Sequence, residues 1–127
     1  MSGTEHLLID TNIIIYYLAG NRVITTFLKQ QRERVHLSVI TKMETLSYPY
    51  ENDEEIVVRA FLACFQQHFL DEAIIEQTIL FRREKKIKLP DAIIAATAFV
   101  YHLTLVTRNT ADFRLTGISI FNPFEEA

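Results

Sequence analysis

Four acidic residues of this chain stand beside apolar segments, in positions where carboxylates can take part in chemistry: Asp10, Glu44, Asp91 and Asp112. Two of them follow apolar runs typical of strands, and two lie at or near the start of helix-like segments. In an open parallel α/β sheet, the loops after the strands and the first turns of the following helices share one edge. Carboxylates gathered there repel by about 4 kcal/mol per pair at ~4 Å, so unless some are protonated a cation must neutralise them. Such a cluster of oxygen ligands suits Mg²⁺ or Mn²⁺ and predicts a metal-dependent phosphoester enzyme.

The size and composition of the chain are those of one globular domain. It has 127 residues, of which 49% are hydrophobic and 23% charged, and this is enough for an ordinary core. Its apolar stretches are far shorter than the roughly 20 residues that span a bilayer, and its N-terminus lacks a signal-peptide pattern. We therefore expect a cytoplasmic protein that does not enter a membrane. Cys64 is the single cysteine, so an internal disulfide is excluded.

The charge of the chain bears on nucleic-acid binding in two opposite ways. A formal net charge of −3 argues against it, because nucleic-acid-binding domains are usually basic. However, metal ions on the four acids would offset that charge, and basic residues gather immediately before Asp91. This cluster is either a solvated helix face or a phosphate-binding surface, and both explanations remain open. The residues that could contact RNA are Arg82, Arg83, Lys85, Lys86, Lys88 and Arg108.

Short apolar or β-branched runs alternate with helical segments along the chain. Strands are expected at residues 6–9, 35–38, 103–107 and 118–121, with a weaker one at 68–70. Helices are expected at residues 12–18, 23–32, 42–46, 54–65, 72–85 and 90–102. This alternation predicts an α/β fold with a parallel sheet and right-handed crossovers. Residues 13–17 have strand propensity, but a strand that continued through Asp10 and Asn12 would be unusually long, so a buried helix is predicted there.

Each of the four acids also has a purely structural explanation. Asp10 or Asn12 could cap the helix that follows, and the pair Thr41 and Glu44 fits a capping box. Asp91 follows a proline in a first helical turn, where a negative charge suits the helix dipole, and Asp112 could end a turn. These explanations do not account for four acids on one edge of the predicted sheet. That coincidence favours a functional site.

Polar residues beside the acids could support such a site, whereas the sequence has no motif of a zinc site, a phosphate-binding loop or a serine nucleophile. The neighbours are Thr11, Asn12, Thr107 and Asn109. They could orient metal-bound waters or a phosphate, or they could merely cap turns, and both roles stay open. The four histidines lack the spacing of a zinc site. There is no glycine-rich phosphate loop, and no serine has nucleophile-elbow surroundings.

The sequence resembles the PIN-domain nucleases, and within them the VapC-type toxins of prokaryotic toxin–antitoxin pairs. The segments that carry this resemblance are residues 9–12, 38–44, 89–98 and 105–113. It extends over almost the whole chain and implies one PIN-like nuclease domain, residues 1–127, with a five-stranded parallel sheet flanked by helices. The metal-binding acids of the family fall on the four acids named above, and Asn109 takes a supporting role. One departure is Lys42, where some relatives place another acid.

The resemblance also implies an activity and partners. Members of this family cut RNA, often structured or transfer RNA, with Mg²⁺ or Mn²⁺, and they are commonly dimers. The expected reaction is hydrolysis of a phosphodiester by metal-activated water, leaving a 5′-phosphate and a 3′-hydroxyl. A cognate antitoxin is implied too, and an arginine from its tail could bridge carboxylates in the pocket between Asp10 and Asp91. Apolar segments within residues 61–80 could receive an antitoxin helix.

Two rival functions come from other classes. A phosphotransferase could use Asp10 as a covalent nucleophile, since an acid directly after a strand is also the arrangement found there. Such enzymes usually need a second aspartate two residues later, and here that position is Asn12, which cannot act as a general acid. A non-catalytic PIN-fold module that binds RNA or protein is the other rival. The presence of all four acids argues against it.

Overall fold

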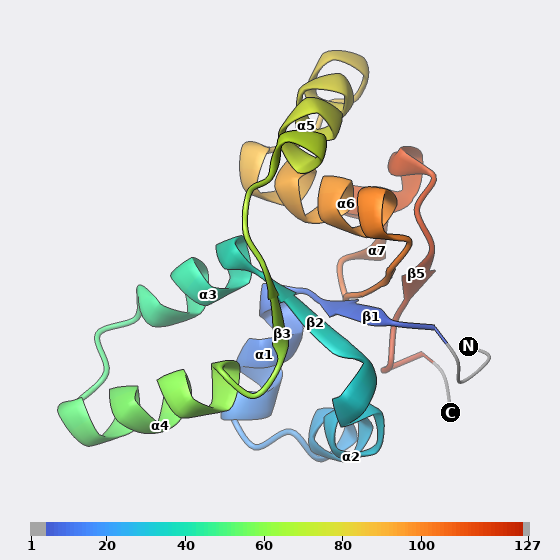
Figure 1. The fold of residues 1–127 in the computed structure, drawn as a ribbon. Coiled ribbons are helices and arrows are strands. Elements are labelled where there is room, and N and C mark those ends of the chain that lie inside the picture. The colour runs from blue at the N-terminus through green and yellow to red at the C-terminus, as the bar shows by residue number, and fades with distance from the viewer. Residues whose placement is uncertain (1–4, 126–127) are drawn as a thin grey trace.

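A five-stranded parallel sheet forms the centre of the molecule in the computed structural model, which describes residues 5–125 (Figure 1). The strands are β1 (Leu7–Ile9), β2 (Val35–Ser38), β3 (Gln66–His68), β4 (Thr104–Val106) and β5 (Ile120–Phe121). Their order is β3-β2-β1-β4-β5, and every pair of neighbours is parallel. The predicted α/β fold with a five-stranded parallel sheet is therefore confirmed. The weaker strand is also present, two residues earlier than expected.

Helices cover both faces of this sheet (Figure 1). They are α1 (Thr11–Leu18), α2 (Arg22–Gln31), α3 (Val39–Leu46), α4 (Asn52–Leu62), α5 (Glu72–Glu84), α6 (Leu89–Tyr101) and α7 (Thr110–Phe113), with short 3₁₀ turns at Arg32–Arg34 and Arg114–Thr116. The hairpin of α5 and α6 lies on one face, and α1, α2 and α4 lie on the other. In the described part of the chain, no helix is long and apolar enough to cross a membrane.

The two faces of the sheet bury two separate hydrophobic cores, because side chains alternate along a strand. Leu8 and Leu105 pack with α5, α6 and Phe113 in one core. Leu7, Ile9 and other residues of the strands pack with α1, α2 and α4 in the second. The residues of the three central strands β2, β1 and β4 are buried on both faces, as expected for a parallel sheet covered by helices, whereas the edge strands β3 and β5 are partly exposed.

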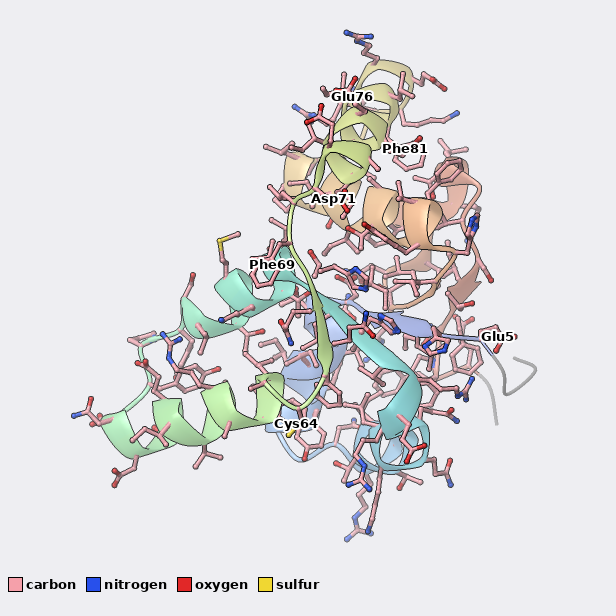
Figure 2. All side chains as sticks on the ribbon, viewed as in Figure 1. Glu5, Cys64, Phe69, Asp71, Glu76 and Phe81 are labelled. Carbon is pink, nitrogen blue, oxygen red and sulfur yellow. The ribbon has the colours of Figure 1, made fainter. Side chains whose placement is uncertain are left out.

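The small residues of α6 allow this helix to pack closely on the sheet. Seven consecutive residues, from Ala92 to Ala98, are buried, and four of them are alanines. Phe81 of α5 is also buried and belongs to the same core, so it joins α5 to α6 (Figure 2). The close packing fixes the start of α6, and therefore Asp91, relative to the sheet.

Most predicted helices form, and the differences have local causes. The segment with strand propensity after Asp10 is helix α1, and Ile13 and Ile14 are buried in it, as predicted. Helix α3 begins three residues earlier than predicted because Ser38 caps it: the Ser38 hydroxyl accepts a hydrogen bond from the Ile40 amide at 3.0 Å. The capping box suggested for Thr41 and Glu44 is therefore wrong, since both residues lie inside α3. Helix α7 was not predicted, because four residues are too few to show helical periodicity.

Three histidine side chains form a row across the sheet. Nδ1 of His6 lies 2.9 Å from Nε2 of His36, and Nδ1 of His36 lies 2.8 Å from Nε2 of His68. The ring of His68 contacts Tyr101 of α6, whose hydroxyl donates a hydrogen bond to Asp71 at the start of α5 (Figure 2). The row thus connects the sheet to the α5–α6 hairpin. Burial, with smaller contributions from its two imidazole neighbours, lowers the pKa of His36 to about 4.

This row makes the stability of the protein depend on pH. The unfolded chain takes up a proton at His36 near pH 6.5, whereas the folded protein takes it up near pH 4. The contribution of His36 to the free energy of unfolding should therefore fall as the pH decreases from about 6.5 to about 4. Asp10, whose pKa is raised to about 6 in the folded protein, acts in the opposite direction over most of that window, so urea denaturation at each pH measures the His36 contribution as the difference between the wild type and a His36 variant. The His36→Asn variant should be less stable at neutral pH but should lose less stability on acidification, and parallel pH curves for the two proteins would contradict the prediction.

Candidate active site

The topology of the sheet places a ligand-binding edge beside β1 and β4. From β1 the chain builds outward through β2 to β3, and it then returns to the other side of β1 for β4 and β5. Crevices at the carboxyl ends of strands form where such a sheet changes direction. Asp10 directly follows β1, and its amide donates to the Val106 carbonyl at 2.9 Å. Thr107 directly follows β4, so these two side chains meet at the change of direction.

Asp10 is buried and held by three hydrogen bonds. Its Oδ1 accepts from the Thr11 amide at 2.8 Å, which caps α1. Its Oδ2 accepts from the Thr107 hydroxyl at 2.7 Å and from Nδ2 of Asn12 at 3.2 Å. The structural explanation offered for Asp10 is therefore correct, and it does not exclude a functional role. A carboxylate has about four acceptor positions, so Oδ1 keeps one for a further ligand.

The surroundings of Asp10 disfavour its charge. Burial raises the pKa of Asp10 to about 6, although the hydrogen bonds from Thr107 and Thr11 oppose this shift. Repulsion from Asp91 and Glu44 raises it further. A buried carboxylate with other carboxylates nearby is the arrangement in which a cation gains most from binding.

Glu44 reaches the site from α3 through a threonine pair. The Thr11 hydroxyl lies 2.6 Å from Oε1 of Glu44, to which it donates, and 3.2 Å from the hydroxyl of Thr41. Thr41 is fully buried at the contact between α1 and α3. These contacts fix the Glu44 carboxylate beside the end of β1.

Asp91 and Asp112 approach from the other side of the site. Asp91 lies in the first turn of α6, and Asp112 lies in the first turn of α7. Burial raises the pKa of Asp91, as does repulsion from Asp112 and Glu44, while Lys88 opposes the shift. The two aspartates line one hollow of about 300 Å³ together with lysines of the segment before α6.

The structure brings the four predicted acids into one electrostatic cluster. Asp10 interacts with Asp91 and Glu44, and Asp91 interacts with Glu44 and Asp112. Among residues 5–125, however, no three acidic, histidine or cysteine side chains are arranged to hold a metal ion as they stand. Hydrogen bonds donated by Thr11 and Thr107 direct the carboxylates of Glu44 and Asp10, respectively.

The supporting residues form a network around Asp10. Nδ2 of Asn12 lies 3.2 Å from the Thr107 hydroxyl, and Oδ1 of Asn12 accepts from the Arg108 amide at 3.3 Å. The Asn109 amide donates to the Thr107 hydroxyl at 3.0 Å, so Asn109 contributes here through its backbone. Asn12 therefore links the turn after β1 to the turn after β4, and both turns are held around the same carboxylate.

Two aromatic residues that the sequence did not single out hold Arg108 at the edge of the site. The Arg108 guanidinium lies 4.7 Å from the ring centre of Phe124 and 5.3 Å from that of Tyr16, and it also contacts the Tyr16 hydroxyl. Such cation–π contacts hold the guanidinium in place. Arg108 directly follows Thr107, so a fixed positive charge is carried by the turn that also binds Asp10. The other candidate basic residues lie at the end of α5 and in the segment before α6.

Comparisons with known proteins match this geometry. The PIN domain family model matches residues 7–118. A toxin-antitoxin complex from Klebsiella pneumoniae contains a chain with 37% sequence identity and a TM-score of 0.82, and the match covers 92% of this chain and 97% of that one. For FitAcB from Neisseria gonorrhoeae the identity is 27%, the TM-score 0.78 and the coverage 93% and 98%. DNA-bound VapBC from Salmonella typhimurium shares the fold, with a TM-score of 0.84, 23% identity and coverage of 94% and 99%. No curated protein sequence matches.

Proposed function

Because the chain belongs to the PIN-domain family, we propose that it is a metal-dependent endoribonuclease and the toxin of a toxin–antitoxin pair. PIN domains typically use divalent metal ions, and we propose Mg²⁺ or Mn²⁺ here. The observation that carries the proposal is that Asp10, buried with its pKa raised to about 6, lies within electrostatic reach of Glu44 and Asp91, and Asp91 within reach of Asp112. The 37% identity to a chain of the Klebsiella toxin-antitoxin complex supports the toxin role.

The donor set fits a divalent cation. Four carboxylates and no sulfur or imidazole ligand suit Mg²⁺ or Mn²⁺ rather than zinc. Burial and repulsion from neighbouring carboxylates raise the pKa of Asp10 and of Asp91, and Lys88 only partly opposes the shift of Asp91; a bound cation would stabilise both charged forms. We propose that Asp10, Asp91 and Asp112 hold the ion, with Glu44 beside it. When bound, such an ion lowers the pKa of an attacking water and stabilises charge on the scissile phosphate.

The protein's own residues position the reaction. Thr107 and Asn12 hold Asp10 in one orientation through hydrogen bonds at 2.7 and 3.2 Å. Thr11 does the same for Glu44. Arg108, fixed between two aromatic rings, can neutralise a phosphate at the rim of the site. Hydrolysis of the RNA phosphodiester would leave a 5′-phosphate and a 3′-hydroxyl.

The phosphotransferase alternative requires a nucleophile that its substrate can reach. Asp10 is only 5% exposed, and both of its oxygens already accept hydrogen bonds. Asn12, which stands where the general acid would be needed, donates its amide to Asp10 and Thr107. These contacts favour a carboxylate that holds an ion over one that attacks phosphorus.

We propose a cognate antitoxin as the protein partner in the cytoplasm, and a homodimer as the assembled toxin. An arginine of the antitoxin tail would occupy the carboxylate cluster and compete with the metal ion, because a planar guanidinium can bridge two carboxylates. Exposed apolar side chains are available within residues 61–80 for an antitoxin helix. They are Phe69, Leu70, Ile75, Ile79 and Leu80, and Phe69 lies between β3 and α5 (Figure 2).

Incubating the purified protein with total cellular RNA tests the nuclease proposal. We expect discrete fragments with new 5′-phosphate ends when Mg²⁺ or Mn²⁺ is present and none when the metal is chelated, because the carboxylates need the ion to act. Sequencing of the new ends would identify the RNA, and transfer RNA is the first candidate. Intact RNA in the presence of both metals, with a protein shown to be folded, would contradict the proposal and favour a non-catalytic binding module.

A further inference from the structure

The last turns of α5 and the segment that leads into α6 form a basic groove beside the acidic site. Residues 82–88 contain five basic residues and one acid, Glu84. A hollow of about 790 Å³ is lined by these five basic side chains and by Thr78, Ile79, Ile87 and Leu89. We call it the basic groove. The hollow that holds Asp91 and Asp112 shares residues 85–88 with it, so the two adjoin along one wall.

Most of these cations have no acidic partner. In the part of the chain that the structure describes, no salt bridge joins any of the five to a carboxylate. Arg82 has a structural task, since its guanidinium donates to the Ile87 carbonyl at 2.6 Å and holds the turn before α6. Lys88 offsets the charge of Asp91. Arg83, Lys85 and Lys86 therefore carry charge that a ligand could neutralise.

The lining of the basic groove indicates which part of a nucleic acid would bind there. Apart from the basic residues and Thr78, the lining is aliphatic, and none of the aromatic side chains within residues 5–125 lines the groove. Surfaces that stack bases of single strands use aromatic rings, whereas contacts with phosphates come chiefly from lysine and arginine and carry no sequence information. A groove of cations without aromatic rings thus suits the sugar–phosphate backbone. It lies beside the carboxylates at which a phosphodiester would be cut.

We propose that the basic groove holds the phosphate backbone of the RNA strand adjacent to the cleaved bond and contributes affinity without base or sugar selectivity. The inference rests on the proposed nuclease function, and it names the part of the chain that binds its substrate. An acidic protein segment would also meet positive charge here. The RNA backbone is the better candidate of the two, because an RNA strand that is cut at the adjoining acidic hollow must pass this groove.

Salt-dependent binding by paired variants tests the proposal. Arg83→Gln with Lys86→Gln removes two charges from the basic groove. Lys29→Gln with Arg32→Gln removes two charges from a groove of about 350 Å³ at the end of α2, and it is the matched control. Each pair of substitutions is introduced into the Asp10→Asn protein for the binding experiments. Binding of short fluorescent single-stranded RNA and DNA is then measured between about 50 and 200 mM salt. Cleavage kinetics are measured for both pairs with Asp10 intact.

The groove variant should bind RNA and DNA more weakly than the control, to the same extent for adenine-rich and uracil-rich sequences. The slope of the logarithm of affinity against that of salt concentration should decrease by about 0.7 for each lost phosphate contact. In cleavage, KM should rise and kcat should stay the same. Equal slopes and KM values in the two pairs would overturn the proposal while leaving the nuclease function intact, and so would groove-dependent binding of a polyglutamate peptide but not of RNA. Groove-dependent RNA binding without any cleavage by the protein with Asp10 intact would support the groove and contradict the nuclease function.

Discussion

Replacing Asp10 with asparagine is expected to abolish RNA cleavage and to make the metal-free protein more stable at neutral pH. Asparagine keeps the shape of Asp10 and can still cap α1, but it removes the charge that would hold the metal ion. The pKa of Asp10 is raised from 3.8 to about 6, which corresponds to a cost of about 3 kcal/mol for the charged form in the folded protein. The variant avoids this cost. When the oxygen of the new asparagine caps α1, its amide nitrogen takes the place of Oδ2 and cannot accept from Thr107 or Asn12. These two hydrogen bonds are worth about 1 kcal/mol each, so a net stabilisation of about 1 kcal/mol is expected.

The stability difference between the Asp10→Asn variant and the wild type should depend on pH. Because the folded pKa of Asp10 is raised, the cost is absent below pH 3.8 and is complete above about pH 6. The advantage of the variant should therefore grow through that window and stay constant above it. Chemical denaturation in chelator measures stability, and a single-turnover assay measures cleavage. We expect the cleavage rate of Asp10→Asn to fall by more than about 100-fold. The Thr107→Val variant, which removes only a hydrogen-bond partner of Asp10, should lose about 10–100-fold. A variant that is less stable at neutral pH would mean that Asp10 serves mainly as a structural residue.

Expression of this chain alone in bacteria is expected to arrest growth, whereas the Asp91→Asn variant should be harmless. An endoribonuclease without its antitoxin would destroy RNA that the cell needs. Asp91 lies in the first turn of α6, and in the described part of the chain its side chain makes no hydrogen bond or salt bridge, so asparagine should leave α6 in place. Viable counts after induction measure the effect, and immunoblotting confirms equal protein levels. Equal growth with both proteins at equal levels would count against the toxin proposal.

The elements of the fold were predictable because their signals are local. Apolar runs between helical segments indicate a parallel sheet. Asp10 follows a strand, and Asp91 and Asp112 lie in first turns of helices, which the topology brings to one edge. The prediction that Glu44 lies near the start of a helix is wrong, because it lies in the second half of α3.

Helix boundaries were less accurate where a cap decides them. The start of α3 depends on whether Ser38 or a later residue caps the helix. Ser38 and Thr41 both have the sequence pattern of a helix cap, and the packing of α3 against the sheet decides which of them caps the helix.

Contacts between distant residues were not predictable. The histidine row joins positions about 30 residues apart, and local spacing gives no sign of it. It depends on the register of β2 and β3, in which Ser38 pairs with His68. The clamp around Arg108 likewise uses Tyr16, 92 residues away. Nothing in the sequence near Arg108 identifies that partner. Only the pairing of β4 with β1 brings the two turns together.

The central position of β1 also bears on when activity can arise during synthesis. Asp10 is made 97 residues before its partner Thr107, and β1 needs β4 as a neighbour. Asp112 follows later still. At about 5–20 residues per second, translation from Asp10 to Asp112 takes on the order of ten seconds. Throughout that time the growing polypeptide has only part of its carboxylate cluster. Under the proposed nuclease function, the growing chain therefore cannot cut its own messenger or ribosome before Asp112 has emerged.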